Sequence, residues 1–337
     1  MSFDFERAID RDGTASVKWD GRAACFGTRD VTPLWVADMD FAAPEAITRA
    51  LAERAAHPVY GYSLYPDGMY DALTGWLQRR HDWPVARASL LMAPGVVPSL
   101  YAAVHAFTQP GEGVIVQPPV YFPFFSAVSS LGRRLVENPL RIEGERYAID
   151  FEHLEQCAAE ARLLFLCSPH NPVGRVWTPD ELRHVLDIAR RHALVVLCDE
   201  IHHDLIYPGQ HHTPLATLAE PGDKLITALA PSKTFNIPGL GLSALIAADP
   251  QHRKQLADAF ELLHAGHHNP FSIAAFEAGY RHGDAWLDAL MAYLAGTRDT
   301  VGTFVTRHLP GMRVIAAEAT YLLWLDCRDL GLDDAAL

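Results

Sequence analysis

The sequence has 337 residues, enough for about two domains of roughly 150 residues each. Apolar residues make up 49% of the chain and charged residues 20%, a composition that excludes a largely disordered protein. The net charge is −13, from 28 lysines and arginines against 41 aspartates and glutamates, so neither nucleic acid nor an anionic membrane is expected as a partner.

No apolar run reaches the roughly 20 residues of a membrane-spanning helix, and the first residues lack the basic and apolar regions of a secretory signal. The five cysteines are scattered and odd in number, and most of them lie in apolar runs. This usage is typical of buried thiols in a reducing compartment. We therefore expect a cytoplasmic protein.

The first predicted elements are helices that follow a mixed segment. Residues 1–43 are interrupted by glycine and proline, and a helix with proline in its first turn is predicted over 44–56. The aromatic-rich loop 59–63 leads to a second predicted helix over 70–81.

From about residue 93 onward, short apolar strands alternate with helices. Strands are predicted at 114–117, 163–167, 194–198, 225–229 and 243–248, and helices at 100–107, 123–131, 151–161 and 179–192. Continuous apolar strands separated by helices indicate a mostly parallel sheet covered on both faces. After Pro250 the chain is predicted to be mainly helical to about His308, with final strands at 312–315 and 320–325.

One lysine stands where a strand ends. Lys233 follows the apolar run 224–230 and is flanked by Ser232 and Thr234, which is not the setting of a solvated surface charge. Burial lowers the pKa of an amine, and the neutral amine is the nucleophile that forms Schiff bases. Considered alone, Lys233 is equally compatible with a structural ion pair.

Two further polar motifs follow neighbouring strands. Asn171 lies in the segment Ser-Pro-His-Asn-Pro-Val-Gly-Arg, and Asp199 opens the segment Asp-Glu-Ile-His-His-Asp. Taken singly, Asp199 is compatible with a helix cap or an ion pair, and Asn171 with a turn before proline. Ligands of open parallel sheets bind beyond the carboxyl ends of the strands. The three side chains together therefore predict a site at this edge of the sheet, which we call the rim.

These motifs resemble the fold-type I pyridoxal-phosphate enzymes, the aspartate aminotransferase superfamily. The segments that look like its cystathionine β-lyase branch, the MalY/PatB type, are 35–41, 60–62, 168–175, 199–202 and 232–237. The resemblance runs from about residue 3 to 325. It implies a large domain with a mostly parallel seven-stranded sheet (44–283) and a smaller α/β domain built from 1–43 and 284–337.

The resemblance also implies the cofactor pyridoxal 5′-phosphate and roles for matching residues. Lys233 would hold the cofactor covalently and then act as base on the Cα proton of the substrate. Asp199 would pair with the pyridine nitrogen, and Asn171 would hydrogen-bond the phenolic oxygen of the ring. His202 stands where aminotransferases usually carry a tyrosine that donates to the same oxygen.

Further roles concern the ring face, the phosphate and the partner chain. Tyr121 would stack on the ring. Phosphate would be bound by Ser232 and by backbone N–H groups around Gly95, Val96 and Val97. Tyr62, counted with Lys233 and Asp199 as catalytic, would reach the phosphate across the interface of a homodimer with shared active sites. The Asn171–Pro172 bond would be cis, as X–Pro bonds permit.

Two features depart from the family pattern. Many aminotransferases carry a phosphate-binding arginine eight residues after the lysine, where this chain has Gly241, so other donors must neutralise the phosphate. Relatives also continue for some tens of residues beyond the position of Leu337, through a segment with the arginine that binds the substrate α-carboxylate. The small domain is therefore expected to be incomplete in this chain.

The implied activity is that of a pyridoxal-phosphate-dependent carbon–sulfur β-lyase, which converts cystathionine or a similar sulfur amino acid to a thiol, pyruvate and ammonia. An aminotransferase is the alternative with the same cofactor, and the segment 35–41 favours the lyase. A non-catalytic protein that keeps the fold for regulation or binding is the alternative of another class. The retention of Asn171, Asp199 and Lys233 argues against it.

Two weaker patterns are given little weight. Residues 239–244 match a dinucleotide-binding pattern, but a strand rather than a helix is predicted to follow. The histidine pairs 202–203, 211–212 and 267–268 fit neither a helical i,i+4 pair nor a thiolate cluster, so they are expected to be surface or loop histidines and no metal site is predicted.

Overall fold

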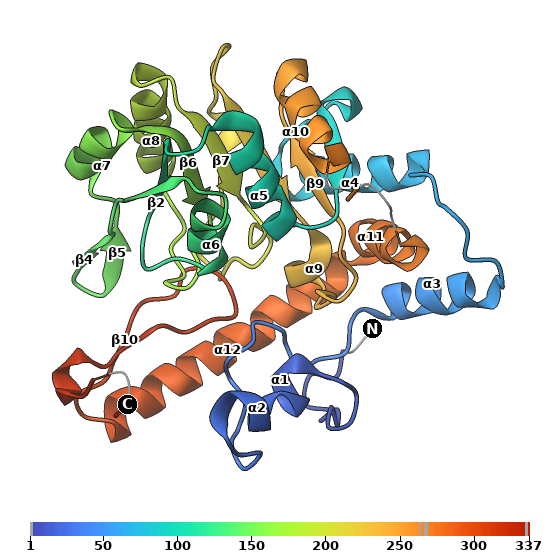
Figure 1. The fold of residues 1–337 in the computed structure, drawn as a ribbon. Coiled ribbons are helices and arrows are strands. Elements are labelled where there is room, and N and C mark those ends of the chain that lie inside the picture. Colours follow the sequence, from blue (N-terminus) through green and yellow to red (C-terminus); the bar gives the residue numbers. More distant parts are fainter. Residues whose placement is uncertain (1–2, 263, 266–268, 334–335) are drawn as a thin grey trace.

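A computed structural model describes residues 3–262, 264–265, 269–333 and 336–337. Its centre is a seven-stranded sheet of order β1-β9-β8-β7-β6-β2-β3 (Figure 1). The strands are β1 (Leu90–Ala93), β2 (Gly113–Val116), β3 (Arg134–Glu137), β6 (Ala161–Cys167), β7 (Val195–Asp199), β8 (Leu225–Leu229) and β9 (Ser243–Ile246). Only β9 runs against its neighbours, which confirms the expected mostly parallel, seven-stranded sheet.

The central strands form where continuous apolar runs were predicted, because these strands are buried on both faces. The sequence analysis did not predict the edge strands β1 and β3. It also missed the outlying hairpin of β4 (Arg141–Glu143) and β5 (Arg146–Ala148). β3 and the two hairpin strands each contain at least one charged residue and only one or two buried or half-buried residues, so they carry no long apolar run.

Helices cover both faces of the sheet, as expected. Alternate residues of β2, β6 and β7 enter two separate cores, one beneath α5, α6 and α10 and the other beneath α7 and α8 (Figure 1). The helices are α1 (Val17–Asp20), α2 (Arg22–Phe26), α3 (Glu45–Ala56), α4 (Asp67–His81), α5 (Val96–Phe107), α6 (Pro123–Ser129), α7 (Phe151–Ala158), α8 (Pro179–Arg191), α9 (Pro231–Thr234), α10 (Pro250–Leu262), α11 (Pro270–His282) and α12 (Asp284–His308). Short 3₁₀ helices span Arg87–Ser89, Leu215–Thr217 and Arg328–Leu330. Among the described helices, none is both long and apolar enough to cross a membrane.

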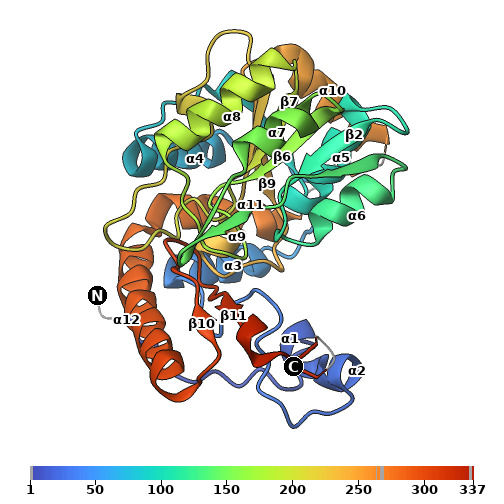
Figure 2. The same cartoon turned by 90° about the vertical axis from the view of Figure 1, so that its left-hand side faces the viewer.

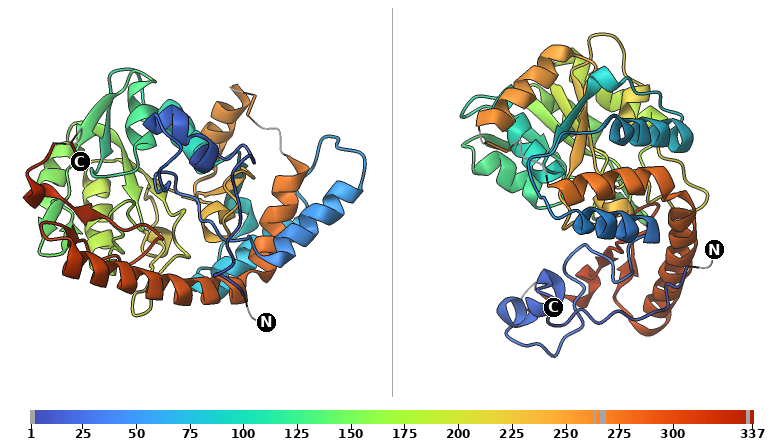
Figure 3. Two further views of the ribbon diagram at one scale, coloured as in Figure 1. Left: turned by 90° about the horizontal axis from the view of Figure 1, so that it is seen from below. Right: turned by 90° about the vertical axis from the view of Figure 1, so that its right-hand side faces the viewer.

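A third core joins the elements beside the lysine. It contains Ile47 from α3, Trp76 from α4, Phe276 from α11 and Leu290 from α12, together with Phe235 just after α9. Figure 3 shows α3 lying along α11 beneath the sheet. The short helix α9 is therefore fixed from below as well as by its own strand.

The strand prediction for 320–325 was wrong for most of the segment. Only Leu325–Asp326 forms a strand, β11, which pairs with β10 (Arg313–Val314). The preceding residues bend, because Thr320 adopts a left-handed backbone with φ +72° and donates its N–H to the Leu205 carbonyl. The two aromatic residues of the segment, Tyr321 and Trp324, are partly buried and pack against two of the cores without being extended in a sheet.

The two ends of the chain lie on the same side of the sheet. Figure 2 shows α1 and α2 below the sheet, near β10 and β11, with α12 running down from the core. These parts lie on the side of the sheet where the carboxyl end of β8 leads into α9.

Candidate active site

Lys233 lies in the short helix α9, which begins two residues after β8 ends. Its Nζ donates a hydrogen bond to the backbone carbonyl of Ala37 at 2.7 Å. Burial lowers the pKa of Lys233 from 10.5, although the carboxylates of Asp38 and Asp199 act in the opposite direction. The amine is therefore shifted toward its nucleophilic form, as expected from the sequence.

Asp199 is the last residue of β7, the strand next to β8. It is 4% exposed, and its Oδ1 accepts a hydrogen bond from the Ile201 N–H at 3.0 Å. Burial raises the pKa of Asp199 to about 7, while the Ile201 hydrogen bond and the charge of Lys233 lower it. Within the described chain no other donor reaches this carboxylate, so it has room for a cationic N–H partner.

Asn171 follows β6, on the other side of β7. The register aligns Cys167 of β6 with Asp199 of β7, so the three motifs follow three adjacent strands at one edge of the sheet. The Asn171–Pro172 bond is cis, as predicted. The Asn171 side chain is nearly buried and makes no hydrogen bond to another described residue. Asn171, Asp199 and Lys233 thus meet at the predicted rim.

His202 and Tyr121 lie close to this group. His202 is 1% exposed, and neither of its ring nitrogens has a hydrogen-bond partner in the described structure. Burial, followed by the charge of Lys233, lowers the pKa of His202 to about 3, so its ring is neutral. Tyr121 is half-buried, and burial together with the charge of Asp199 raises the pKa of its hydroxyl.

The start of α5 offers backbone donors where phosphate binding was expected. Gly95 is its N-cap residue, no side chain caps the helix, and Pro98 in the first turn has no N–H. The free N–H groups of the first turn, at Val96 and Val97, are suited to an anion. Ser232 lies in the first turn of α9.

Gly241, the position where many relatives carry arginine, is in contact with this loop. A Cβ atom at Gly241 would lie 2.9 Å from the carbonyl oxygen of Pro94, the residue before Gly95. A side chain there would push the start of α5 away. Any side chain at position 241 therefore requires the Pro94 backbone to shift.

Tyr62 is not brought to the rim within a single chain. It is 96% exposed in the loop between α3 and α4, which Figure 1 shows at the edge of the molecule.

Tyr321 was missed by the sequence analysis. Its hydroxyl donates to the Ala37 carbonyl at 2.8 Å, so Tyr321 and Lys233 share one acceptor. Its ring lies 6.1 Å from the ring of His202. The only signal in the sequence was an aromatic residue inside a run interpreted as a strand.

Asn236, three residues after the lysine, was part of a recognised motif but was given no role. Its side chain accepts from the Met39 N–H at 2.9 Å and donates to the carbonyls of Met39 and Phe41 at 2.8 Å each. The residue adopts a left-handed backbone with φ +56°, which asparagine tolerates better than most residues. Asn236 thereby attaches the N-terminal segment beside Lys233.

Arg175, at the end of the asparagine motif, is not free to bind a substrate. It is buried, and its guanidinium contacts the carboxylates of Glu181 and Glu318 at 2.8 and 2.5 Å. This arginine therefore joins the rim to the segment near Tyr321.

The structure shows where the two weaker sequence patterns, the glycine pattern at 239–244 and the histidine pairs, lie. β9 begins at Ser243, so a strand does follow the glycine pattern at 239–244 and the dinucleotide reading lacks its helix. His202, His203 and His212 lie in loops as predicted but are buried, so a surface position was wrong for them. The pair 267–268 lies outside the described residues.

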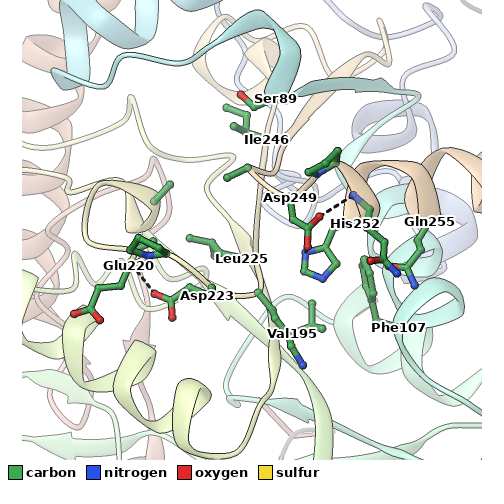
Figure 4. A pocket seen from close by; sticks show the side chains of 18 of the residues that line it. Ser89, Phe107, Val195, Glu220, Asp223, Leu225, Ile246, Asp249, His252 and Gln255 are labelled. Atoms are coloured by element: carbon green, nitrogen blue, oxygen red, sulfur yellow. Dashed lines mark hydrogen bonds and ion pairs between the residues drawn. The ribbon is translucent and has the colours of Figure 1, made fainter.

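A large cavity lies away from the rim. Its volume is about 990 Å³, and it is lined by Val195 and Leu225 at the opposite, amino-terminal ends of β7 and β8 (Figure 4). His252 and Asp249 face each other across 3.9 Å in its wall. Because the cavity contains none of the rim residues, cavity size does not locate the candidate active site.

Comparisons with known proteins agree with this geometry. Residues 29–337 match the family model described as aminotransferase class I and II. Cystathionine β-lyase PatB of Bacillus subtilis is 44% identical over 99% of this chain and 87% of its own length. Protein MalY of Escherichia coli is 34% identical over 99% of this chain and 86% of its own length.

Solved structures give the same result. Cystalysin from Treponema denticola, with a pyridoxal 5′-phosphate cofactor, has a TM-score of 0.96 and 36% identity, over 100% of this chain and 86% of that one. The pyridoxal-phosphate-bound C–S lyase from Staphylococcus hominis has a TM-score of 0.91 and 30% identity, over 99% and 86%. The sheet and the rim lysine define a fold-type I pyridoxal-phosphate enzyme.

The chain belongs to the class I and II aminotransferase family, in its cystathionine β-lyase branch. The described residues fit the cofactor of this family. Asp199 has unused acceptor capacity, both ring nitrogens of His202 are buried without partners, and the first turn of α5 is uncapped. A pyridine nitrogen, a phenolic oxygen and a phosphate, respectively, would be the missing hydrogen-bond partners of these groups.

Proposed function

We propose that this chain is a carbon–sulfur β-lyase that converts a sulfur amino acid of the cystathionine type to a thiol, pyruvate and ammonia. The proposal rests on the meeting of Lys233, Asp199 and Asn171 at one rim in a chain 44% identical to a cystathionine β-lyase. The enzyme depends on pyridoxal 5′-phosphate, as its family does.

Each rim residue has a role that follows from its surroundings. The chemistry that pyridoxal phosphate would supply here is an acceptor for the electron pair left at the substrate Cα when a proton is removed there. Lys233 Nζ, whose pKa is lowered by burial, would hold the cofactor and, once the substrate amine has displaced it, would be the base that takes the Cα proton. Asp199 would keep a proton on the pyridine nitrogen, because a cationic ring N–H beside this buried carboxyl favours its carboxylate form.

Asn171 and His202 are placed to hold the phenolic oxygen. The amide of Asn171 has two N–H groups free of other described partners, and the neutral ring of His202 has one. Tyr121 would cover the ring face. Ser232 and the N–H groups at the start of α5, around Gly95, Val96 and Val97, would bind the phosphate.

The direct test is turnover of cystathionine by the cofactor-loaded protein, with pyruvate and ammonia measured together. We expect both products in equal amounts without any added 2-oxo acid. A protein that binds the cofactor but releases neither product from cystathionine or from cysteine conjugates would contradict the lyase proposal.

The second candidate is an aminotransferase. The probable N-succinyldiaminopimelate aminotransferase DapC of Mycobacterium tuberculosis is 31% identical over 77% of this chain and 65% of its own length. An aminotransferase would need a 2-oxo acid as amino acceptor and would leave the carbon–sulfur bond intact. Pyruvate released without an acceptor therefore separates the two activities.

The homodimer is part of the proposal. The loop carrying Tyr62 exposes a run of apolar side chains, Val59, Tyr60, Tyr62 and Leu64. Monomers rarely leave such a run open to water, so a second copy of the chain is its natural partner. Tyr62 would then reach the phosphate site of the other chain.

Mixed dimers test a shared site. Lys233→Ala and Tyr62→Phe chains, each poorly active alone, are unfolded together and refolded with cofactor. If sites are shared, half of the dimers carry one complete site, so activity returns to about a quarter of the wild-type value. Recovery no greater than the sum of the two variants would contradict the sharing.

Two further assignments belong to the proposal. The cytoplasmic location is supported by five cysteines that are all unpaired in the structure. The division into a large domain (44–283) and a smaller one (1–43 with 284–337) is supported by the position of both chain ends below the sheet (Figure 2).

A further inference from the structure

A second cluster of functional side chains lies outside the rim. It consists of His81, the last residue of α4, with His203 and Asp204 in the turn after β7. One candidate ligand atom from each residue lies within 4.8 Å of the other two, and the two imidazole rings are 4.7 Å apart. Their side chains are 7%, 1% and 0% exposed, so the cluster is almost dry.

The hydrogen bonding of His203 leaves the lone pair of its Nε2 without a donor. Its Nδ1 is 2.6 Å from the Glu200 carbonyl, which can only accept, so Nδ1 carries the hydrogen. Nε2 of the neutral ring is then an acceptor, and it has no hydrogen-bond partner in the described structure. It faces Oδ2 of Asp204 at 3.3 Å, which is also an acceptor. Two buried acceptors that face each other repel unless a proton or a metal cation lies between them.

The carboxylate of Asp204 is held in a fixed orientation. Oδ1 accepts from Trp76 Nε1 at 3.0 Å and lies 2.8 Å from His81 Nε2. Oδ2 accepts from the Thr234 hydroxyl at 2.8 Å. Hydrogen bonds of this kind, which orient a ligand from outside, are characteristic of metal sites in proteins.

The cluster borders a cavity with space for a further ligand. The cavity has a volume of about 340 Å³, and Gln210, His211 and His212 line it together with the three cluster residues. Arg80 also lines it, but its guanidinium is paired with Asp288 at 2.8 Å. The positive charge of Arg80 is therefore compensated by Asp288.

We propose that His81 Nε2, His203 Nε2 and Asp204 bind one divalent transition-metal ion, with zinc as the preferred ion and water in the fourth position. Two imidazoles and one carboxylate are a ligand set that suits zinc. Bond lengths of about 2.0–2.2 Å place neighbouring ligands of a tetrahedral ion about 3.3–3.6 Å apart. The separation of His203 Nε2 and Asp204 Oδ2 already matches this spacing.

Only a small rearrangement is needed. His81 would exchange its Nε2 contact with Asp204 for the metal and carry its hydrogen on Nδ1, so its ring stays neutral. The ion would join the end of α4 to the turn after β7. Through the bond from Asp204 to Thr234, the residue after Lys233, it would also steady α9.

The test compares zinc binding by three forms of the cofactor-loaded protein: wild type, His203→Ser and His211→Ser. Each is stripped with a chelator, dialysed against zinc and analysed for bound metal and by calorimetric titration. His211 is the matched control, because it lines the same cavity but is exposed and outside the ligand set. We expect one tightly bound zinc in wild type and His211→Ser. His203→Ser should bind at least about tenfold more weakly, since even loss of an outer partner of a ligand costs about 10–100-fold.

Absence of saturable zinc in the wild type, or equal binding by His203→Ser, would overturn the proposal. Cobalt in the wild type gives a second measurement that does not depend on the folding of a variant. The visible bands of a tetrahedral ion with nitrogen ligands are expected, and an octahedral aquo spectrum would overturn the proposal. Nitrogen NMR that finds both ring nitrogens of His203 protonated in the presence of zinc would show that a proton, not a metal, separates the two acceptors.

Discussion

The amine of Lys233 donates a hydrogen bond to the carbonyl of Ala37, 196 residues earlier in the chain, at a distance of 2.7 Å. The hydroxyl of Tyr321 donates to the same oxygen at 2.8 Å. The proposed catalytic lysine is therefore positioned by the N-terminal segment and the C-terminal segment as well as by its own strand.

Lys233→Ala should remove the visible absorbance of the lysine-bound cofactor and reduce turnover by at least about 100-fold, because both the attachment point and the base are lost. Absorption spectra and the pyruvate assay measure the two effects. Lys224→Ala is the matched control, because Lys224 is an exposed lysine directly before β8, at the end of that strand opposite Lys233. A visible spectrum unchanged in Lys233→Ala would refute the assignment.

Asp199→Asn should retain the cofactor but lose about 100–1,000-fold in turnover, because the buried charge opposite the pyridine nitrogen is removed. Cofactor content and kcat are measured on the same preparation. Asp180→Asn, with a side chain 94% exposed, serves as control. Turnover that stays near the wild-type value in Asp199→Asn would exclude the proposed role.

Asp199 also predicts a pH dependence of the stability of the cofactor-free protein. Its folded pKa of about 7 lies above the ordinary value of 3.8, so between these values the folded state holds a proton that the unfolded state does not. The stability due to this group is complete below about pH 4 and is lost as the pH rises toward 7. Urea unfolding of wild type and Asp199→Asn should therefore show wild type losing stability relative to the variant between pH 5 and pH 8. A difference independent of pH would contradict the buried state of Asp199.

Asn236→Gly should weaken the attachment of the N-terminal segment, because three hydrogen bonds to Met39 and Phe41 are lost. Glycine accepts the left-handed backbone, so the variant isolates the side chain, and we expect a loss of about 1–3 kcal/mol. Urea unfolding gives the stability, and faster proteolysis within residues 1–43 gives the location. Wild-type protease resistance in this segment would argue against the attachment.

Gly241→Ala should weaken cofactor binding by about tenfold, equivalent to about 1.4 kcal/mol, because its Cβ would press on the Pro94 carbonyl beside the start of α5. Gly239→Ala is the control, since nothing lies within 4 Å of a Cβ at that position. Cofactor titration of the two stripped variants measures the difference. Equal affinities would show that the contact at Gly241 does not shape the phosphate site.

Much of the fold could be predicted because burial and sequence pattern agree in the centre of the sheet. β6, β7 and β8 are buried on both faces, so each is a continuous apolar run, and the polar residue that follows each run falls at one rim. Asn171, Asp199 and Lys233 were found in this way. The roles assigned to them, and to Tyr121, Ser232 and Tyr62, stay predictions.

Contacts between distant segments could not be predicted. Nothing near Ala37 or Tyr321 in the sequence indicates that they meet at Lys233, because the meeting depends on how the two chain ends pack below the sheet. His81 escaped notice for the same reason. It lies 123 residues before Asp204, whereas the sequence analysis searched for ligands at short spacing and predicted no metal site.

Because Lys233 and Tyr321 both donate to the Ala37 carbonyl, the proposed active site is not complete in any single continuous part of the chain. A fragment limited to residues 44–283 would contain the whole sheet and all three rim residues, and yet the amine of Lys233 would have lost its acceptor. A separate peptide that contains Ala37 would supply this acceptor again when it binds the fragment. The first forty residues thus belong to the proposed active site through a backbone carbonyl, although none of their side chains was assigned to it.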